Sequence, residues 1–320
     1  MSEKIADLGE FGLIRAVTAR LPQGPSVLVG PGDDAAVIVA GDGRVVATTD
    51  LLVENRHFRR SWSSAQDVGC KAAAQSLADI AAMGAVPTAL LVGLGAPADL
   101  PVDWALGLAD GLRDECEPLG VSVVGGDVVQ SDLVVVAVTA LGDLGGRPPV
   151  TRGGARPGDV VAICGRLGWA EAGLRVLSRG FRSPRVLVEA HRRPQVPYDA
   201  GPEAARLGAT AMCDVSDGLL ADLGHVASAS GVAVDVDPAA FEVPDPIRDA
   251  AAALGVEPLD WILTGGEDNA LAATFPRDVT LPQRWRVIGR VAAGEGVTVA
   301  GAGYEGSPGH VHFGRSSTDG

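Results

Sequence analysis

The sequence predicts an α/β (α+β) protein of two domains, each built around a mixed sheet flanked by helices. Strand-like apolar runs alternate with amphipathic helical runs along the chain, which is the pattern of this class. The length of 320 residues exceeds one average domain, and an apolar fraction of 47% provides for a sizeable core. A stretch rich in Gly, Pro and Arg at residues 145–158 separates the halves, so we expect domains at residues 1–148 and 149–320.

Helical periodicity marks four segments. In the first, residues 64–83, Ser64 can cap the N-terminus, Asp67 follows three residues on, and Gly84 suits the position after the last turn. The other helices are expected at residues 101–119, 170–178 and 219–230.

Short apolar runs predict the strands. The runs at residues 37–39 and 45–49 flank Gly41-Asp42-Gly43, which is a hairpin pattern. The runs at residues 121–124 and 133–141 are expected on either side of a turn that contains Gly125-Gly126-Asp127. Further strands are expected at residues 160–164, 232–236 and 271–275.

The composition argues against several classes of partner. A net charge of −14 disfavours nucleic acid, because such binding relies on Lys and Arg at phosphates. No uncharged apolar run is long enough to span a membrane, and the first residues carry acids where a signal peptide needs a basic stretch. The four cysteines are far apart and form no CxxC pair, which argues against zinc or a disulfide framework. We expect a cytoplasmic protein that binds neither nucleic acid nor a membrane.

Clusters of acidic residues and glycine recur along the chain. They are GPGDD at 30–34, TTD at 48–50, Asp79 within LADIAAMGA, GGD at 125–127 and DVSDG at 214–218. Mg²⁺ prefers carboxylates together with substrate phosphates, and glycine lets backbone N–H groups approach a phosphate. A surface turn is the simpler interpretation of any single cluster. Five clusters on one chain, several of them beside apolar strands, favour a site for magnesium and phosphate.

Other candidate residues are less specific. Lys71, Gln75 and Asp79 share one helix face, which is usually a solvated face. Arg152 could clamp a phosphate or belong to a basic linker. His57 has no role that its spacing alone assigns. The chain lacks the P-loop pattern G-x-x-x-x-G-K-[ST], a G-x-G-x-x-G after a strand and a G-x-S-x-G elbow.

Taken together and in order, these motifs resemble those of the thiamine-monophosphate kinases. The motifs are GEFGLI (9–14), GPGDDAAV (30–37), TTD with ENRHF (48–58), LADIAAMGA (77–85), GGD (125–127), TRGGARPGD (151–159), DVSDGLLADLGH (214–225) and GGED (265–268). The resemblance spans nearly the whole chain. That family belongs to the superfamily of aminoimidazole-ribonucleotide synthetase, whose ATP sites use no P-loop.

The resemblance implies a homodimer that binds ATP and thiamine monophosphate. Residues 1–148 would bind ATP and Mg²⁺ and form the dimer, and residues 149–320 would complete the active-site cleft. Several Mg²⁺ ions would be held by Asp33, Thr48, Thr49, Asp50, Asp79, Asp127, Asp214 and Asp217. ATP would contact Gly126, Asp127, Arg152 and Ser216, and the substrate would contact His57, Glu267 and His310. Two positions depart from the family pattern: His310 replaces an aromatic residue, and Asn269 follows GGED where the family often has Tyr.

The implied reaction is direct in-line transfer of the ATP γ-phosphate to thiamine monophosphate, which would give thiamine diphosphate. Because a phosphate oxygen is already ionised at neutral pH, no covalent nucleophile is required, and metals would neutralise the two anions. Two alternatives stay open. One is an ATP-dependent enzyme like aminoimidazole-ribonucleotide synthetase, and the other is a non-catalytic regulator that binds Mg²⁺ and nucleotide.

Overall fold

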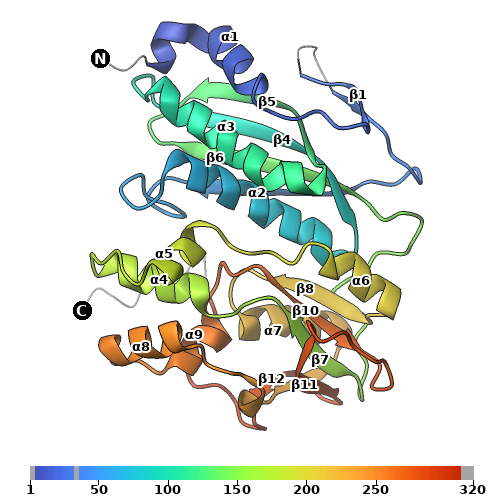
Figure 1. Cartoon of the computed structure of the whole chain (residues 1–320). Coiled ribbons are helices and arrows are strands. Elements are labelled where there is room, and N and C mark those ends of the chain that lie inside the picture. The colour runs from blue at the N-terminus through green and yellow to red at the C-terminus, as the bar shows by residue number, and fades with distance from the viewer. Residues whose placement is uncertain (1–3, 32–35, 311–320) are drawn as a thin grey trace. The chain divides into compact units, whose positions relative to one another are not determined.

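The computed structural model describes residues 4–31 and 36–310, and the chain forms two compact units (Figure 1). Unit 1 comprises Met1–Pro149 and Tyr198–Ala205, and unit 2 comprises Val150–Pro197 and Arg206–Gly320. The segment Tyr198–Ala205 therefore packs with unit 1 although it lies within the sequence of unit 2. Among the described residues, no helix combines the length and the apolar character that crossing a membrane requires.

Unit 1 is a four-stranded sheet with helices on one face. Its strands, in spatial order, are β3 (Val46–Val53), β6 (Val135–Asp143), β4 (Val86–Ala96) and β5 (Ser122–Gln130). Only the pair of β4 and β5 is parallel among these. The helices are α1 (Ile5–Thr18), α2 (Ala65–Ala82) and α3 (Val102–Cys116), followed by a short 3₁₀ turn at Glu117–Leu119.

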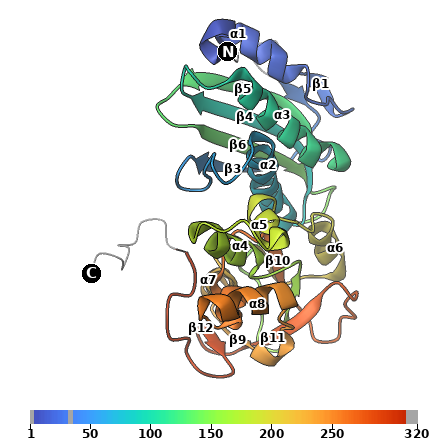
Figure 2. The same ribbon diagram turned by 60° about the vertical axis from the view of Figure 1, so that its left-hand side comes forward.

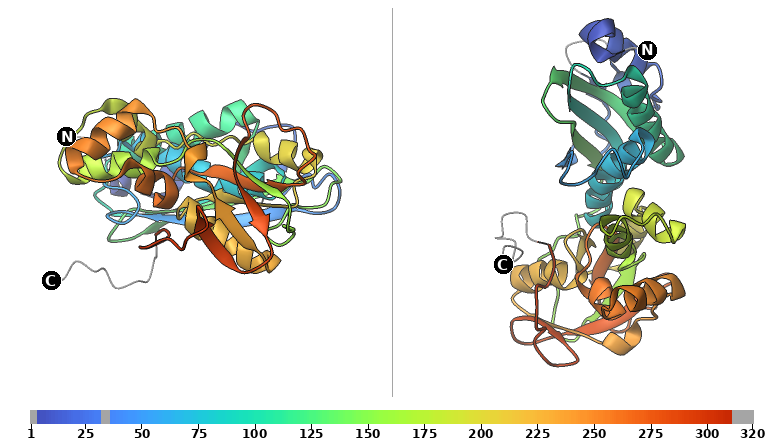
Figure 3. Two further views of the ribbon diagram at one scale, coloured as in Figure 1. Left: turned by 90° about the horizontal axis from the view of Figure 1, so that it is seen from below. Right: turned by 90° about the vertical axis from the view of Figure 1, so that its left-hand side faces the viewer.

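Alternation along β6 shows which face of this sheet is buried. Val136, Val138 and Ala140 are fully buried and contribute to the core, whereas the residues between them are half-buried. In the right-hand view of Figure 3, α2 and α3 lie on one side of the sheet, and the other side carries no helix among the described residues of unit 1. The helix-covered face and the open face therefore present different environments to successive residues of each strand.

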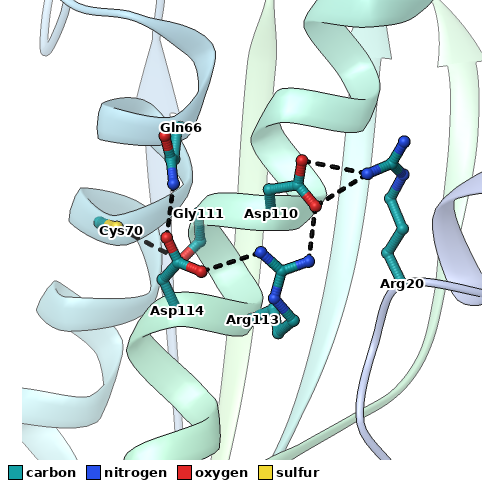
Figure 4. Close-up of polar contacts among 7 residues, drawn as sticks. All are labelled: Arg20, Gln66, Cys70, Asp110, Gly111, Arg113 and Asp114. Carbon is teal, nitrogen blue, oxygen red and sulfur yellow. Dashed lines mark hydrogen bonds and ion pairs between the residues drawn. The ribbon is translucent and has the colours of Figure 1, made fainter.

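Glycines allow α2 and α3 to pack closely. A Cβ on Gly111 would lie 2.1 Å from the carbonyl oxygen of Gln66, and one on Gly69 would lie 2.2 Å from that of Leu108. Beside this contact, charged side chains link the segment after α1 to α3, and the uncharged Gln66 of α2 donates a hydrogen bond to Asp114 of α3 (Figure 4). The charged side chains are Arg20, which bonds Asp110, and Arg113, which bonds both Asp110 and Asp114. Since these side chains are 26–38% exposed and ion pairs that solvent reaches contribute little, we attribute the helix pairing to packing more than to the ion pairs.

Unit 2 is a six-stranded sheet with its own core. In spatial order the strands are β12 (Gly296–Val299), β9 (Ala233–Val236), β11 (Arg286–Ala292), β7 (Val160–Cys164), β10 (Ala270–Phe275) and β8 (Ala211–Val215). The helices are α4 (Trp169–Ser178), α5 (Arg185–Arg192), α7 (Leu219–Ser230), α8 (Asp245–Leu254) and α9 (Pro258–Thr264), with a 3₁₀ turn at Pro238–Ala240. Most of α6 (Ala200–Leu207) belongs to the segment Tyr198–Ala205 of unit 1. Helices α4 and α5 lie side by side (Figure 1, Figure 2).

Several predicted elements are confirmed. Ser64 caps α2 by accepting a hydrogen bond from the N–H of Asp67, which returns one to Ser64, so the predicted capping box is present. The expected helix at 219–230 and the expected strand at 160–164 match α7 and β7 in both bounds.

Two predictions from local patterns are wrong. The hairpin expected around Gly41-Asp42-Gly43 does not form, because β2 (Val37–Ile38) pairs with β1 (Val27–Val29) and β3 pairs with β6. The turn expected at Gly125-Gly126-Asp127 is part of β5, which pairs with β4 and not with β6. Strands β3 and β5 pair instead with strands that are distant in the sequence, and this pairing overrode a local turn signal that depended on glycine and aspartate.

Candidate functional site

Strand β3 and helix α2 bring together oxygen-bearing side chains on the helix-covered face of unit 1. Thr48 and Asp50 are two residues apart on β3 and therefore point to the same face. Thr48 Oγ1 donates a hydrogen bond of 2.6 Å to Asp79 Oδ2, and Ser76 Oγ donates one of 2.7 Å to Asp50 Oδ2. Ser76 and Asp79 are three residues apart on α2, so they share a helix face. The result is a set of two carboxylates and two hydroxyls, of which the sequence prediction missed Ser76.

Two other predicted ligands of unit 1 lie away from this cluster. Thr49 is exposed on β3, where its hydroxyl bonds the carbonyl of Val138 and accepts a hydrogen bond from Thr139. Asp127 is exposed on β5 at the opposite edge of the sheet, and its Oδ1 accepts the N–H of Val128. Because Val128 packs against the helix-side core, the carboxylate of Asp127 points away from that core. Asp50 and Asp127 therefore do not share one site within this unit.

His57 follows β3 and is hydrogen-bonded to the last residue of that strand. Its Nδ1 accepts the N–H of Val53 at 3.0 Å, so the neutral imidazole carries its proton on Nε2. Lys71 Nζ donates a hydrogen bond to the carbonyl of His57 at 3.3 Å. The interpretation of Lys71, Gln75 and Asp79 as a solvated face is wrong for Lys71, which is 2% exposed.

In unit 2 the segment DVSDG wraps around a single carboxylate. Asp222 Oδ2 accepts the backbone N–H groups of Ser216, Asp217 and Gly218, each at 3.1 Å. Burial raises the pKa of Asp222 to about 6, while these hydrogen bonds and the positive charge of Arg152 act in the opposite direction. Arg152 itself is exposed, and its backbone carbonyl accepts a hydrogen bond of 3.0 Å from Ser230, the last residue of α7.

Asp222 and His225 are functional candidates that the sequence reasoning did not single out. Ligand atoms of Asp217, Asp222 and His225 all lie within 4.8 Å of one another. Both residues lie in the quoted motif DVSDGLLADLGH, and their three-residue spacing on α7 is the signal that could have identified them. Since Asp222 Oδ2 already accepts three hydrogen bonds, we interpret Asp222 first as the group that shapes this loop.

The GGED segment is joined to the DVSDG segment through the backbone. The N–H of Glu267 donates to the carbonyl of Ser216 at 2.8 Å, and that of Asn269 donates to Val215 at 2.9 Å. Glu267 and Asn269 have φ values of 66° and 49°, a left-handed conformation that is uncommon outside glycine. Such backbone strain is found most often at functional sites.

Further predicted residues lie at the same place. The N–H of His310 donates to the carbonyl of Asp217 at 2.8 Å, which brings the C-terminal segment beside DVSDG. Asp214 is buried at the end of β8, where it is the strand partner of Leu271. Unit 2 thus gathers the predicted residues Asp214, Ser216, Asp217, Glu267 and His310.

Asp268 and Asn269 are buried polar residues of this loop. Asp268 accepts the N–H groups of Gly168 and Ala170 at the start of α4, and burial raises the pKa of its carboxyl to about 7. Asn269 is 1% exposed, and neither polar atom of its side chain has a hydrogen-bond partner among the described residues. A buried amide without hydrogen-bond partners lowers the stability of the fold, so we infer that Asn269 serves a purpose other than stability.

The remaining predicted residues are Gly126 and Asp33. A Cβ on Gly126 would lie 1.9 Å from the carbonyl oxygen of Val92, so the approach of β5 to β4 requires glycine there. Asp33 lies in the segment 32–35, outside the described residues.

Comparison with known proteins finds the same family from sequence and from structure. The family models described as AIR synthase related protein, N-terminal domain and C-terminal domain, match residues 32–144 and 156–301. A curated thiamine-monophosphate kinase of Mycobacterium tuberculosis is 49% identical over 100% of this chain and 96% of that protein. The crystal structure of thiamine-monophosphate kinase from Stenotrophomonas maltophilia K279a is 32% identical with a TM-score of 0.79, over 90% of this chain and 95% of that chain. The structure of AaThiL complexed with AMPPCP and TMP is 30% identical with a TM-score of 0.78, and the match covers 97% of this chain and 100% of that chain.

Proposed function

Since the chain belongs to the thiamine-monophosphate kinase family of AIR synthase related proteins, we propose that it phosphorylates thiamine monophosphate with ATP. The products are thiamine diphosphate and ADP. The observation that carries the proposal is the likeness, over 97% of this chain, to a relative solved with AMPPCP and TMP. The proposal is also supported by the carboxylates and hydroxyls that the sequence motifs contribute, such as Thr48, Asp50 and Asp79.

The side chains of both units fit magnesium. Carboxylates and hydroxyls are oxygen ligands, and Mg²⁺ commonly uses one or two carboxylates together with substrate phosphates. Thr48, Asp50 and Asp79 would hold metal in unit 1, and Asp214 and Asp217 would do so in unit 2. When bound, the metal neutralises the phosphates that must approach each other. Thr49 and Asp127 lie apart from the first group, so in this proposal they serve a separate ion or nucleotide contact.

The other residues bind and orient the reactants. Gly126, Arg152 and Ser216 contact ATP, with the Arg152 guanidinium suited to a phosphate. His57, whose proton lies on Nε2, donates toward the substrate. Glu267 offers a carboxylate that complements the cationic thiazolium ring of thiamine, and His310 adjoins the same segment through Asp217. ATP and Mg²⁺ binding and dimerisation are assigned to residues 1–148, and completion of the active site to residues 149–320.

The open face of the unit 1 sheet supports the proposed homodimer. Leu51, Leu91 and Val129 are 55%, 37% and 55% exposed, and they belong to three of its four strands. Apolar side chains gathered on one sheet face are typical of an interface. Sedimentation of the wild type should give a dimer, and Leu91→Glu should shift it toward monomer. A monomeric wild type at micromolar concentration would refute this part.

Transfer of a label tests the reaction itself. With γ-³²P-ATP and unlabelled thiamine monophosphate, the label should appear in thiamine diphosphate. Release of label only as inorganic phosphate would instead favour ATP hydrolysis coupled to another reaction.

A further inference from the structure

The side chain of Glu267 has a buried partner that no motif pointed to. His191 lies in the last turn of α5, and its Nδ1 is 3.3 Å from Glu267 Oε2. The His191 side chain is 5% exposed and that of Glu267 is 25% exposed. The carboxylate can therefore be reached from solvent while the imidazole lies beneath it.

We propose that His191 is a positioning residue, which holds the Glu267 carboxylate in the orientation that the acceptor requires. The inference rests on the proposed function, because it takes Glu267 as a contact of thiamine monophosphate. The two atoms are at ion-pair distance but outside hydrogen-bond geometry, so the carboxylate must turn slightly before it can accept an Nδ1–H group. His191 acts through Glu267 and does not itself touch the substrate.

The surrounding structure fixes the position of His191. A Cβ on Gly173 of α4 would lie 2.1 Å from the carbonyl oxygen of Leu187 and 2.9 Å from the Cβ of His191. The glycine thus lets α5 approach α4 closely at the level of His191. Because protein interiors are closely packed, this helix contact leaves the His191 imidazole little room to move.

The backbone of Glu267 is fixed as well. Its left-handed conformation is supported by the hydrogen bond to Ser216, and the next residue, Asp268, accepts N–H groups at the start of α4. The loop that carries these two adjacent acidic residues therefore contacts both helices, because Asp268 bonds α4 and Glu267 lies against His191 of α5. With the backbone held, the contact with His191 selects among the rotamers of a long and flexible side chain.

Two substitutions of His191 separate positioning from packing. The side-chain nitrogen of Asn is as many bonds from Cβ as Nδ1 of His, so His191→Asn retains a donor near Oε2, whereas His191→Leu fills space without one. We expect His191→Leu to raise the KM for thiamine monophosphate about tenfold, the usual effect of losing one contact with a charged group. The kcat and the KM for Mg-ATP should stay close to wild type, and His191→Asn should restore most of the acceptor KM. Val186→Ala, at an exposed position of the same helix, is the matched control and should change neither KM.

A double-mutant cycle tests whether His191 acts through Glu267. Once Glu267→Gln is present, adding His191→Leu should change the acceptor KM little, because the two residues act as a unit. If His191→Leu proves unstable in thermal unfolding, His191→Met, which also lacks a donor, replaces it in the cycle. Equal acceptor KM values for His191→Asn and His191→Leu, or a full effect in the Glu267→Gln background, would overturn the inference. A wild-type enzyme that makes no thiamine diphosphate would instead overturn the proposed function.

Discussion

Ser76 of α2 donates a hydrogen bond of 2.7 Å to Asp50 of the edge strand β3, and so fixes one carboxylate of the oxygen cluster against the helix. Three residues further along α2, Asp79 accepts a hydrogen bond from Thr48 of the same strand. Each predicted acid of this pair is therefore oriented by a hydroxyl from the opposite element. A preorganised carboxylate pair of this kind suits a metal site that must form without large rearrangement.

Removal of a metal-binding carboxylate should abolish most of the activity. Asp50→Asn and Asp127→Asn should each lower kcat by about two orders of magnitude or more, in line with the several kcal/mol that a catalytic metal supplies. Activity should also be lost in EDTA and restored by added Mg²⁺. Steady-state kinetics across a magnesium titration measures both effects. Full activity in EDTA, or near-normal rates in both variants, would contradict the assignment.

Substrate affinity should separate from nucleotide affinity in two variants. His57→Ala and Glu267→Ala should weaken binding of thiamine monophosphate by about ten- to a hundredfold, because each removes one charge-assisted contact. Neither residue belongs to the proposed metal ligands, so the affinity for Mg-ATP should be nearly unchanged. Calorimetric titration of each variant with each ligand measures this. An equal loss of Mg-ATP affinity would move these residues away from the acceptor.

Stability should fall as pH rises across the titration of Asp268. Burial raises the pKa of this carboxyl from 3.8 to about 7, so the folded protein keeps a proton that the unfolded chain loses. The contribution to stability is present below about pH 4 and is lost by about pH 7, since the unfolded state binds fewer protons in that window. Urea unfolding of the wild type and Asp268→Asn at several pH values measures it. The variant should show a shallower decline, and an equal slope in both proteins would refute the role of Asp268.

Two glycine substitutions should have opposite effects on stability. Gly111→Ala places a methyl group 2.1 Å from the carbonyl oxygen of Gln66 and should destabilise unit 1, because overpacking typically costs about 1–3 kcal/mol. Gly224→Ala on α7 meets no atom within 4 Å and should stabilise its helix by up to about 1 kcal/mol. Thermal unfolding of both variants makes the comparison, since both gain the same helix propensity. A stabilised Gly111→Ala would contradict the close packing of α2 and α3.

Local patterns predicted the helices better than the strand pairing. The capping box at Ser64 and Asp67 could be identified because its partners are three residues apart. The partners of β3 and β5 could not, because they are set by contacts between distant segments that no local signal encodes. The strand position of Gly125-Gly126-Asp127 illustrates the point, since Gly126 is required by its approach to β4 and not by a turn.

The site residues stay a prediction made from residue type, and the sequence did not predict how their side chains are oriented. Asp50, Asp79 and Asp217 lie in motifs whose chemistry is apparent from sequence. The sequence analysis missed the residues that orient the site, because their contacts become apparent only in the folded structure. Ser76 acts through a hydroxyl, Asp222 through three backbone hydrogen bonds, and His191 through its contact with Glu267. Asp222 lies in the motif DVSDGLLADLGH, whereas nothing in the sequence around Ser76 or His191 marks them as neighbours of the site.

The most direct test of this account is product analysis by mass after incubation with ATP, Mg²⁺ and thiamine monophosphate. The account predicts thiamine diphosphate and ADP in equal amounts, and no thiamine diphosphate from Asp50→Asn or when Mg²⁺ is omitted. Turnover of formylglycinamidine ribonucleotide with no thiamine diphosphate formed would contradict it and would assign the chain the synthetase reaction instead.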